Sequence, residues 1–384
     1  MVDETTQTPA TFAGNRRAGA TVWLVWAVVL ASVVLAPLVA VAWIAALPAE
    51  NIWPHLLSTT LPRYLRNTVI TMLSVGVITA VVGAGCAWLV TMYRFPFSRV
   101  LQWALFMPLA VPAFVGAFAV IDFLEYAGLV QISFCAVFGW ETSRDYWFLE
   151  IGSRGMAIVV LSASLFPYVY LLARAAFREM SAASFDVARA LGAEPWQRFW
   201  SIGLPLARPA IAAGAAIVMM ETVNDFGTVD RFAVQTLTIG IFSVWLEQNN
   251  AGGASQIAMV VLILILVGLE RGARSRAKTF CQTQRDRPIQ PETLGGLLGF
   301  AAFVACLLPF LIGLVLPVCV ISLNAFSGDG PWFSDRLVSA LRNTVFAGTA
   351  AAVATVTAGV LLVYGVRLTQ RAKAERMLPI TSIG

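Results

Sequence analysis

Long apolar stretches, separated by short polar segments that carry arginine, are the dominant pattern of this chain. An α-helix needs about 20 predominantly apolar residues to cross a bilayer, and stretches near that length recur throughout the sequence. A further apolar segment, 232–246, is short enough to be an interfacial or re-entrant helix. The pattern predicts eight membrane spans, at about 22–47, 68–92, 100–123, 155–177, 210–229, 256–269, 296–323 and 344–366.

The composition independently indicates a membrane protein. Hydrophobic residues make up 59% of the chain, charged residues only 12%, and the mean hydropathy is +0.78. Soluble domains contain about 25% charged residues, so this chain cannot cover a water-facing surface. Helices satisfy their own backbone hydrogen bonds in lipid. We therefore expect an all-α polytopic membrane protein.

The placement of lysine and arginine predicts its orientation. If the N-terminus is cytoplasmic, most of the 26 basic residues fall on the inner side, as the positive-inside rule expects. The outer loops are then 48–67, 124–154 and 324–343. The net charge of +5 arises from the inner segments. No segment presents a basic groove with stacking aromatic residues, so we expect no nucleic-acid partner.

The sequence offers few groups for enzymatic or metal chemistry. His55 is the only histidine, and the five cysteines lack metal-ligand spacing. No Gly-x4-Gly-Lys-Ser/Thr phosphate loop is present, so any ATP hydrolysis must be done by another subunit. We expect no cofactor and no resident metal. The first apolar stretch is longer than a signal-peptide core and is expected to remain as a span.

The polar interruption 181–205 has the pattern of two short helices joined by a sharp turn. Ser181–Leu191 can form the first helix, and Gly192 suits the left-handed residue that ends it. Pro195 suits the first turn of the second helix. Pro205 and Pro209 are expected to break the helix before the chain enters the next apolar span. An ordinary amphipathic loop helix is the alternative interpretation.

The spacing within this segment resembles the EAA loop of permease subunits from bacterial binding-protein-dependent ABC importers. That pattern is Glu-Ala-Ala, three residues, Gly, nine residues, Ile, one residue, Leu-Pro. Here an aspartate keeps the charge of the first position, and a valine replaces the second residue. The resemblance implies a MetI-like, type I transmembrane domain whose partners are a cytoplasmic ATPase dimer and a periplasmic substrate-binding protein. The positions that match the loop are Asp186, Val187, Ala188, Gly192, Ile202, Leu204 and Pro205.

A repeat divides the chain into unequal parts. The residues Leu65–Val69 recur as Leu341–Val345, and both copies open an apolar span, with Asn67 and Asn343 as expected helix N-caps. The predicted organisation is a first permease domain followed by the start of a second one that is cut short at Gly384. The second permease half would come from further sequence or from another copy. The expected boundaries are 1–21 for a cytoplasmic tail, 22–269 for the first domain, 270–292 for a cytoplasmic linker and 293–384 for the second domain.

A second group of polar residues lies at the end of the fifth predicted span. Carboxylates near membrane depth normally face a cavity, a partner or water, and Glu221 and Asp225 are spaced to share one helix face. Together with Asn224 and Pro112 they are candidates for the translocation path. The alternative is that the carboxylates cap a helix end. Pro108, Pro112 and Pro167 are candidates for bends that shape this path, with ordinary packing kinks as the alternative.

The segments Met220–Val229 and Val234–Ile241 resemble those of fused double permeases of the ferric-iron importer family. Thiamine permeases share that architecture. The resemblance implies an ATP-driven import of ferric iron across the bacterial inner membrane. Thiamine, a polyamine or a phosphonate is the alternative cargo in the same class. An ion-coupled secondary transporter is the alternative of a different class, and the loop 181–205 argues against it because such a carrier has no ATPase to dock.

Overall fold

The computed structural model describes residues 11–47, 60–126, 128–140, 146, 148, 150–276, 290–327 and 334–381. His55 and most of the predicted linker lie outside these residues. Two compact units are present, one formed by 1–43 with 329–384 and the other by 44–328. The first unit contains most of the long helix α1 (Thr11–Ala46) and all of α16 (Asp335–Thr381). Their described apolar residues are largely exposed.

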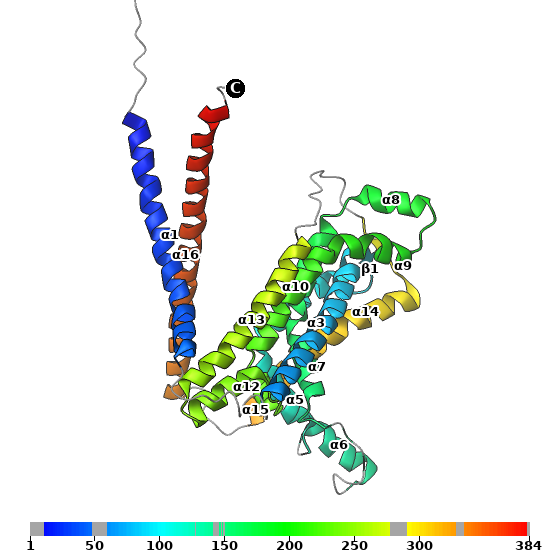
Figure 1. Cartoon of the computed structure of the whole chain (residues 1–384). Helices are drawn as coiled ribbons and strands as arrows, with labels where there is room; N and C mark the ends of the chain where they lie inside the picture. Colours follow the sequence, from blue (N-terminus) through cyan, green and yellow to red (C-terminus); the bar gives the residue numbers. More distant parts are fainter. Residues whose placement is uncertain are drawn as a thin grey trace, which may run out of the picture. The chain divides into compact units, whose positions relative to one another are not determined.

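The described residues of the unit 44–328 form a bundle of helices with one short strand pair. Figure 1 shows α8 and α9 at one end of this bundle and α6 at the other. Its helices are α3 (Leu61–Met92), α4 (Ser98–Ala104), α5 (Ala113–Leu124), α6 (Leu129–Phe138), α7 (Arg154–Arg178), α8 (Ala182–Ala190), α9 (Pro195–Arg198), α10 (Leu204–Asn224), α11 (Gly227–Arg231), α12 (Leu237–Phe242), α13 (Ala251–Arg276), α14 (Gly296–Phe310) and α15 (Leu316–Ser327). The strands are β1 (Tyr93–Arg94) and β2 (Glu292–Thr293). The segment η1 (Met107–Ala110) is a 3-10 helix, and the wider π-helical turns are η2 (Phe199–Gly203), η3 (Ser243–Glu247) and η4 (Leu311–Val315).

The membrane-spanning helices largely follow the predicted apolar stretches. Six helices in the described residues are long and apolar enough to cross a bilayer, and a bent pair would make seven. The sixth predicted span falls in α13, whose apolar part, Ala251–Val267, is shorter. The segment predicted as a short helix at 232–246 overlaps the apolar helix Leu237–Glu247. The all-α, polytopic fold class is therefore confirmed.

The third predicted span is a correction, because it is not one straight helix. The pieces Ser98–Ala110 and Ala113–Leu124 meet at an angle of 94°. Pro112 is extended (φ −57°, ψ 141°) and precedes α5, and Val111 before it is also extended. A residue before proline is driven out of the helical region. Hydropathy alone does not detect such a break, although Pro108 and Pro112 were singled out as possible bends.

Helices α3, α7 and α10 cross closely at the centre of the bundle. A methyl group added at Gly83 of α3 would lie 2.8 Å from Cβ of Val169 in α7, and one added at Gly214 of α10 would lie 2.7 Å from the Cα atom of Val169. The side chains of Phe166 and Tyr170 are fully buried on the same helix. Small residues at such crossings let backbones approach, as is typical of packed membrane helices.

The segment after the predicted linker packs in the same unit as the first domain. Strand β2 pairs in parallel with β1, with Tyr93 opposite Glu292. The amide of Asn324 in α15 donates a hydrogen bond of 2.7 Å to Asp122 of α5. Helices α14 and α15 thus lie against elements of the region 22–269. The four domain boundaries themselves stay a prediction.

The predicted N-caps at Asn67 and Asn343 are wrong. Helix α3 begins at Leu61, with Pro62 in its first turn, so Asn67 lies inside the helix; Asn343 likewise lies inside α16. Proline is well suited to a helix start, which explains the earlier beginning of α3. The Asn67 amide instead donates to the backbone oxygen of Gln235 (2.9 Å) and accepts from Arg154 (3.2 Å).

The crossing at Gly83 provides a stability test. Replacing Gly83 with alanine is expected to lower the free energy of unfolding by about 1–3 kcal/mol, because the added carbon would overpack the interface with α7. Gly85 is the matched control, because it lies two residues away in α3 and has no atom within 4 Å of an added methyl group. Thermal unfolding of the purified variants in detergent measures both. Equal melting temperatures for Gly83→Ala and Gly85→Ala would contradict the close crossing.

Candidate functional site

The first part of the loop 181–205 forms the predicted helix and elbow. The Ser181 hydroxyl accepts a hydrogen bond from the Ala183 backbone N–H (3.2 Å) at the start of α8. Gly192 has φ +77°. Its N–H donates to the Arg189 oxygen (3.0 Å), and the N–H of Ala193 donates to the Ala188 oxygen (2.9 Å). These two bonds form a Schellman motif, the usual helix ending at a left-handed glycine.

The second part of the loop leads directly into a membrane helix. The side chains of Glu194 and Gln197 form a capping box at the start of α9, with Pro195 in the first turn. The wide turn η2 then joins α9 to α10. Pro205 lies in the first turn of α10, and Pro209 lies inside it. The predicted break at these prolines is therefore wrong: the helix runs from Pro195 to Asn224. The turn just before Pro205 is widened, with the Leu204 N–H bonded to the Phe199 oxygen, and the helix then continues through Pro209.

The loop presents an apolar surface to solvent while anchoring its base in the bundle. The Phe185 side chain is buried against the Trp88 ring, with 6.0 Å between the ring centroids. Asp186 and Gly192 are exposed, whereas Ala188, Ile202, Leu204 and Pro205 are partly buried. We name the exposed apolar side chains of α8, α9 and their flanks the coupling face; they are Val187, Leu191, Trp196 and Trp200.

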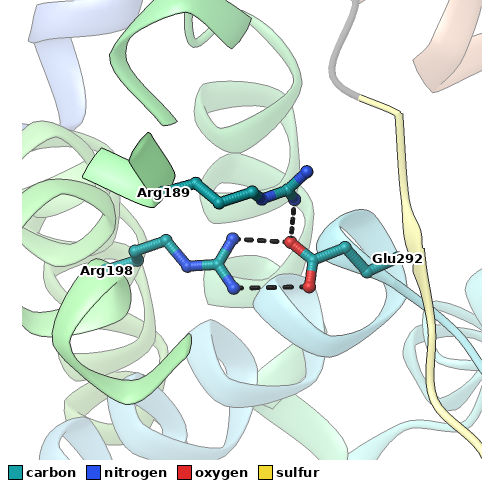
Figure 2. A network of polar contacts seen from close by, with 3 residues as sticks. All are labelled: Arg189, Arg198 and Glu292. Carbon is teal, nitrogen blue, oxygen red and sulfur yellow. Dashed lines mark hydrogen bonds and ion pairs between the residues drawn. The ribbon is translucent and has the colours of Figure 1, made fainter. Parts of the chain in front are cut away.

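One carboxylate holds the two halves of the loop together (Figure 2). The Glu292 carboxylate accepts hydrogen bonds from Arg189 at the end of α8 and from Arg198 at the end of α9. Arg198 contacts both oxygens, with Nη1–Oε1 and Nη2–Oε2 distances of 2.5 and 3.3 Å. The side chain of Arg198 is only 9% exposed, against 55% for Arg189 and 35% for Glu292. We call these three residues the arginine–glutamate clamp.

The clamp is a charged contact at neutral pH. The hydrogen bond from Arg198 is the main cause that lowers the pKa of the Glu292 carboxyl, and partial burial opposes it. Because the folded protein has the lower pKa, the contact adds stability above the ordinary pKa of the carboxyl. That contribution is lost as the pH falls through the lowered pKa. A pocket of about 350 Å³ adjoins the clamp, between Trp88 and Phe185 and the segment 290–292.

The four residues proposed for the translocation path line a single pocket of about 280 Å³. Glu221, Asn224 and Asp225 come from the end of α10, and Pro112 comes from the bend before α5. The described lining contains two carboxylates and no lysine, arginine or histidine. We call it the acidic pocket; its other residues are Leu109, Val111, Ala113, Leu161, Ser164, Leu165 and Tyr168.

The expectation that Glu221 and Asp225 share one helix face needs correction. Helix α10 ends at Asn224, and Asp225 is already extended (φ −70°, ψ 120°). The Asp225 carboxylate accepts from the backbone N–H of Thr228, at 3.2 and 3.1 Å. Asp225 therefore holds the start of α11 and also reaches the pocket. The capping interpretation thus holds for Asp225, and its place in the translocation path stays a prediction.

Sequence reasoning missed the clamp and two hydroxyl groups of the acidic pocket. Glu292 contacts Arg198 across 94 positions of sequence, and no local pattern marks such a pair. Ser164 and Tyr168 lie within an apolar span, where four-residue spacing places them on one face of α7. That spacing next to Pro167 was an available signal. Among the described residues, no group of three or more His, Cys, Asp or Glu side chains is arranged to hold a metal ion.

Comparison with known proteins connects these features to a class of membrane transport components. A family described as "Binding-protein-dependent transport system inner membrane component" matches residues 72–269. The match covers both α3–α7–α10 and the loop 181–205. The chain belongs to this family, whose members are components of membrane transport systems rather than enzymes. It is accordingly a multi-pass protein of the inner membrane, and the resemblance to binding-protein-dependent ABC permeases is confirmed.

Individual relatives differ in what they transport. The Fe(3+)-transport system permease protein FbpB 2 of Haemophilus influenzae is 28% identical over 53% of this chain and 36% of its own length. The sulfate transport system permease protein CysT of Escherichia coli is 26% identical over 61% of this chain and 84% of its own. The chain thus spans little more than a third of the length of the iron permease.

A solved structure supports the fold. The bacterial alginate ABC transporter, crystallised with a periplasmic protein carrying an alginate pentasaccharide, contains a chain that matches with a TM-score of 0.52 and 17% identity. The match covers 67% of this chain and 96% of that one. At this identity the likeness concerns the fold alone, and it agrees with the MetI-like class expected from the loop.

Proposed function

We propose that this chain is a transmembrane subunit of an ATP-driven importer that moves ferric iron from a periplasmic binding protein into the cytoplasm. In this proposal a cytoplasmic ATPase dimer grips the loop 181–205, the N-terminus is cytoplasmic, and a second permease half completes the path. The acidic pocket is the observation that carries the choice of cargo.

The coupling face supports an ATPase partner. Leu191 and Trp196 are 82% and 67% exposed. They lie on either side of the elbow, where the end of α8 and the start of α9 are both capped. Rigid apolar surfaces of this kind mark protein interaction sites. An ion-coupled carrier has no ATPase that would bind such a surface, so the importer is favoured over a secondary transporter.

The charge of the acidic pocket supports a cationic cargo. Two carboxylates without a basic neighbour in the lining repel sulfate and molybdate dianions, and they attract a metal cation in a site of low dielectric. Carboxylate, hydroxyl and amide oxygens are hard ligands suited to a small, highly charged ion. Their small number allows release, which a conduit requires. Thiamine and polyamines are cationic too, and they are separated from iron by the experiment below; a phosphonate is disfavoured by its negative charge.

The first prediction concerns the elbow. Replacing Gly192 with valine is expected to uncouple ATP hydrolysis from transport, because a left-handed β-branched residue costs about 1–2 kcal/mol or more. Space is not the reason, since no atom lies within 4 Å of an added methyl group. Gly192→Asn is the control, because asparagine tolerates this conformation. Solute taken up per ATP hydrolysed is the measurement, and wild-type coupling in Gly192→Val at normal abundance would contradict the role of the elbow.

The second prediction concerns cargo. The neutral substitutions Glu221→Gln and Asp225→Asn are expected to lower uptake of radioactive Fe3+ about tenfold or more, because the loss of one partly buried ion contact costs about 1.4 kcal/mol or more. Glu125→Gln is the matched control: Glu125 is exposed at the end of α5, outside the acidic pocket. Cells that express the chain with its ATPase and binding protein are assayed for uptake.

Parallel assays with labelled thiamine, spermidine and sulfate identify the alternatives. Uptake of one of these solutes without Fe3+ uptake would replace iron as the cargo. Sulfate uptake that rises with the neutral substitutions would contradict a cation path altogether.

The third prediction concerns orientation. Cysteines introduced at Ser181 and Ser334 are expected to lie on opposite sides of the membrane, since they fall in a predicted inner and a predicted outer segment. In intact spheroplasts, a membrane-impermeant maleimide should label Ser334→Cys and spare Ser181→Cys, relative to the unsubstituted parent. Labelling of both positions without permeabilisation would overturn the orientation.

A further inference from the structure

We propose that Glu292 is a positioning residue that transmits movement of the loop 181–205 to the helix pair α14–α15. The inference rests on the proposed ATPase coupling and is independent of the cargo. It concerns the arginine–glutamate clamp, in which the last residue of the predicted linker contacts both sides of the elbow (Figure 2).

The clamp fixes the two loop helices relative to one another. Arg189 ends α8 and Arg198 ends α9, with the flexible position Gly192 between them. Glu292 bridges both guanidinium groups, so neither helix can turn about the elbow without disturbing the carboxylate. The contact with Arg198 uses both carboxylate oxygens, and such two-point contacts fix orientation as well as distance.

Burial makes the contact with Arg198 the essential one. Its side chain is 9% exposed, and its Nε atom is buried without a hydrogen-bond partner in the described structure. The only hydrogen bonds found for the guanidinium among the described residues go to Glu292. Removal of the carboxylate would leave a buried charge without a partner, which is strongly unfavourable.

Backbone contacts fix Glu292 to the start of α14. Strand β2 pairs with β1, and the N–H of Leu294 donates to the Arg94 oxygen (2.8 Å). The Leu294 side chain then packs with Phe303 of α14 against the core cluster that contains Trp88 and Phe185. A methyl group added at Gly299 would lie 2.5 Å from the Leu294 oxygen. Displacement of Glu292 therefore displaces α14 as well.

The helix pair continues from the clamp to the acidic pocket. At Gly313, between α14 and α15, an added methyl group would lie 3.1 Å from Cβ of Pro108. Farther along, Pro317 packs near Gly116 of α5, and Asn324 binds Asp122. Pro112 and Ala113 at the start of α5 line the acidic pocket. Contiguous contacts thus run from the coupling face through Glu292, α14 and α15 to the pocket wall, as a mechanical path requires.

A double-mutant cycle tests this role in the full chain assembled with its ATPase and binding protein in proteoliposomes. The variants are Glu292→Gln, Arg198→Gln and the two combined. The matched control is Glu179→Gln, since Glu179 is an exposed carboxylate just before the loop. The readouts are ATP hydrolysis stimulated by the binding protein, solute uptake per ATP, and the ATPase concentration that gives half-maximal activity.

Each single substitution is expected to lower stimulated ATP hydrolysis and uptake per ATP about tenfold, within the range found for coupling residues. The double variant should lose about the same amount rather than about a hundredfold, because both substitutions break one contact. The half-maximal ATPase concentration should stay unchanged, since the coupling face remains intact. A merely structural defect would instead lower abundance or change that concentration.

If Arg198→Gln is recovered in too small an amount, Arg189→Gln replaces it in the cycle. Wild-type coupling in Glu292→Gln, or multiplicative losses in the double variant, would overturn the proposal. Absence of Fe3+ uptake by the wild-type complex would reject the proposed cargo only. The stimulated hydrolysis would still report on the clamp in that case.

Discussion

The close fit of Val169 between Gly83 and Gly214 is the contact on which the bundle depends. In lipid there is no hydrophobic driving force for helices to associate. Helix backbones must therefore approach closely enough for van der Waals contacts to hold the helices together. The two glycines allow this on both sides of α7. Helix α7 in turn carries Ser164 and Tyr168 to the acidic pocket and ends just before the loop 181–205. One crossing thereby places both candidate sites.

Charge is used sparingly and in two different ways. At the loop, Glu292 is matched by two arginines, which fixes geometry and leaves an apolar coupling face for a partner. In the acidic pocket, Glu221 and Asp225 have no basic neighbour in the described lining, which supports the cationic cargo that we propose. The first arrangement suits a joint that must keep its shape. The second suits a surface that must bind briefly and release.

The sequence predicted those features that depend on local chemistry. The lengths of the apolar stretches predicted most of the membrane spans. The pattern of Ser181, Gly192 and Pro195 predicted the two helices of the loop and the elbow between them. Contacts between distant segments cannot be predicted in this way: the position of Asn67 before an apolar stretch favours a helix cap, whereas its partner Gln235 lies 168 positions away. The sequence predicts a possible bend at Pro112, but the angle between the two helical pieces also depends on how α5 packs with α15. Glu292 was assigned to a linker, because only the pairing of β1 with β2 brings it to Arg198.

The bend before α5 also has an electrostatic consequence. By ending one helical piece and starting another, it places Ala113, the first residue of α5, and Pro112 before it at the wall of the acidic pocket. The first backbone N–H groups of a helix have no partner within it, and the helix dipole adds a partial positive charge at that end. A straight span would bring no helix end to this depth. The broken helix thus brings the partial positive charge of a helix start to the same pocket wall as the carboxylates of Glu221 and Asp225.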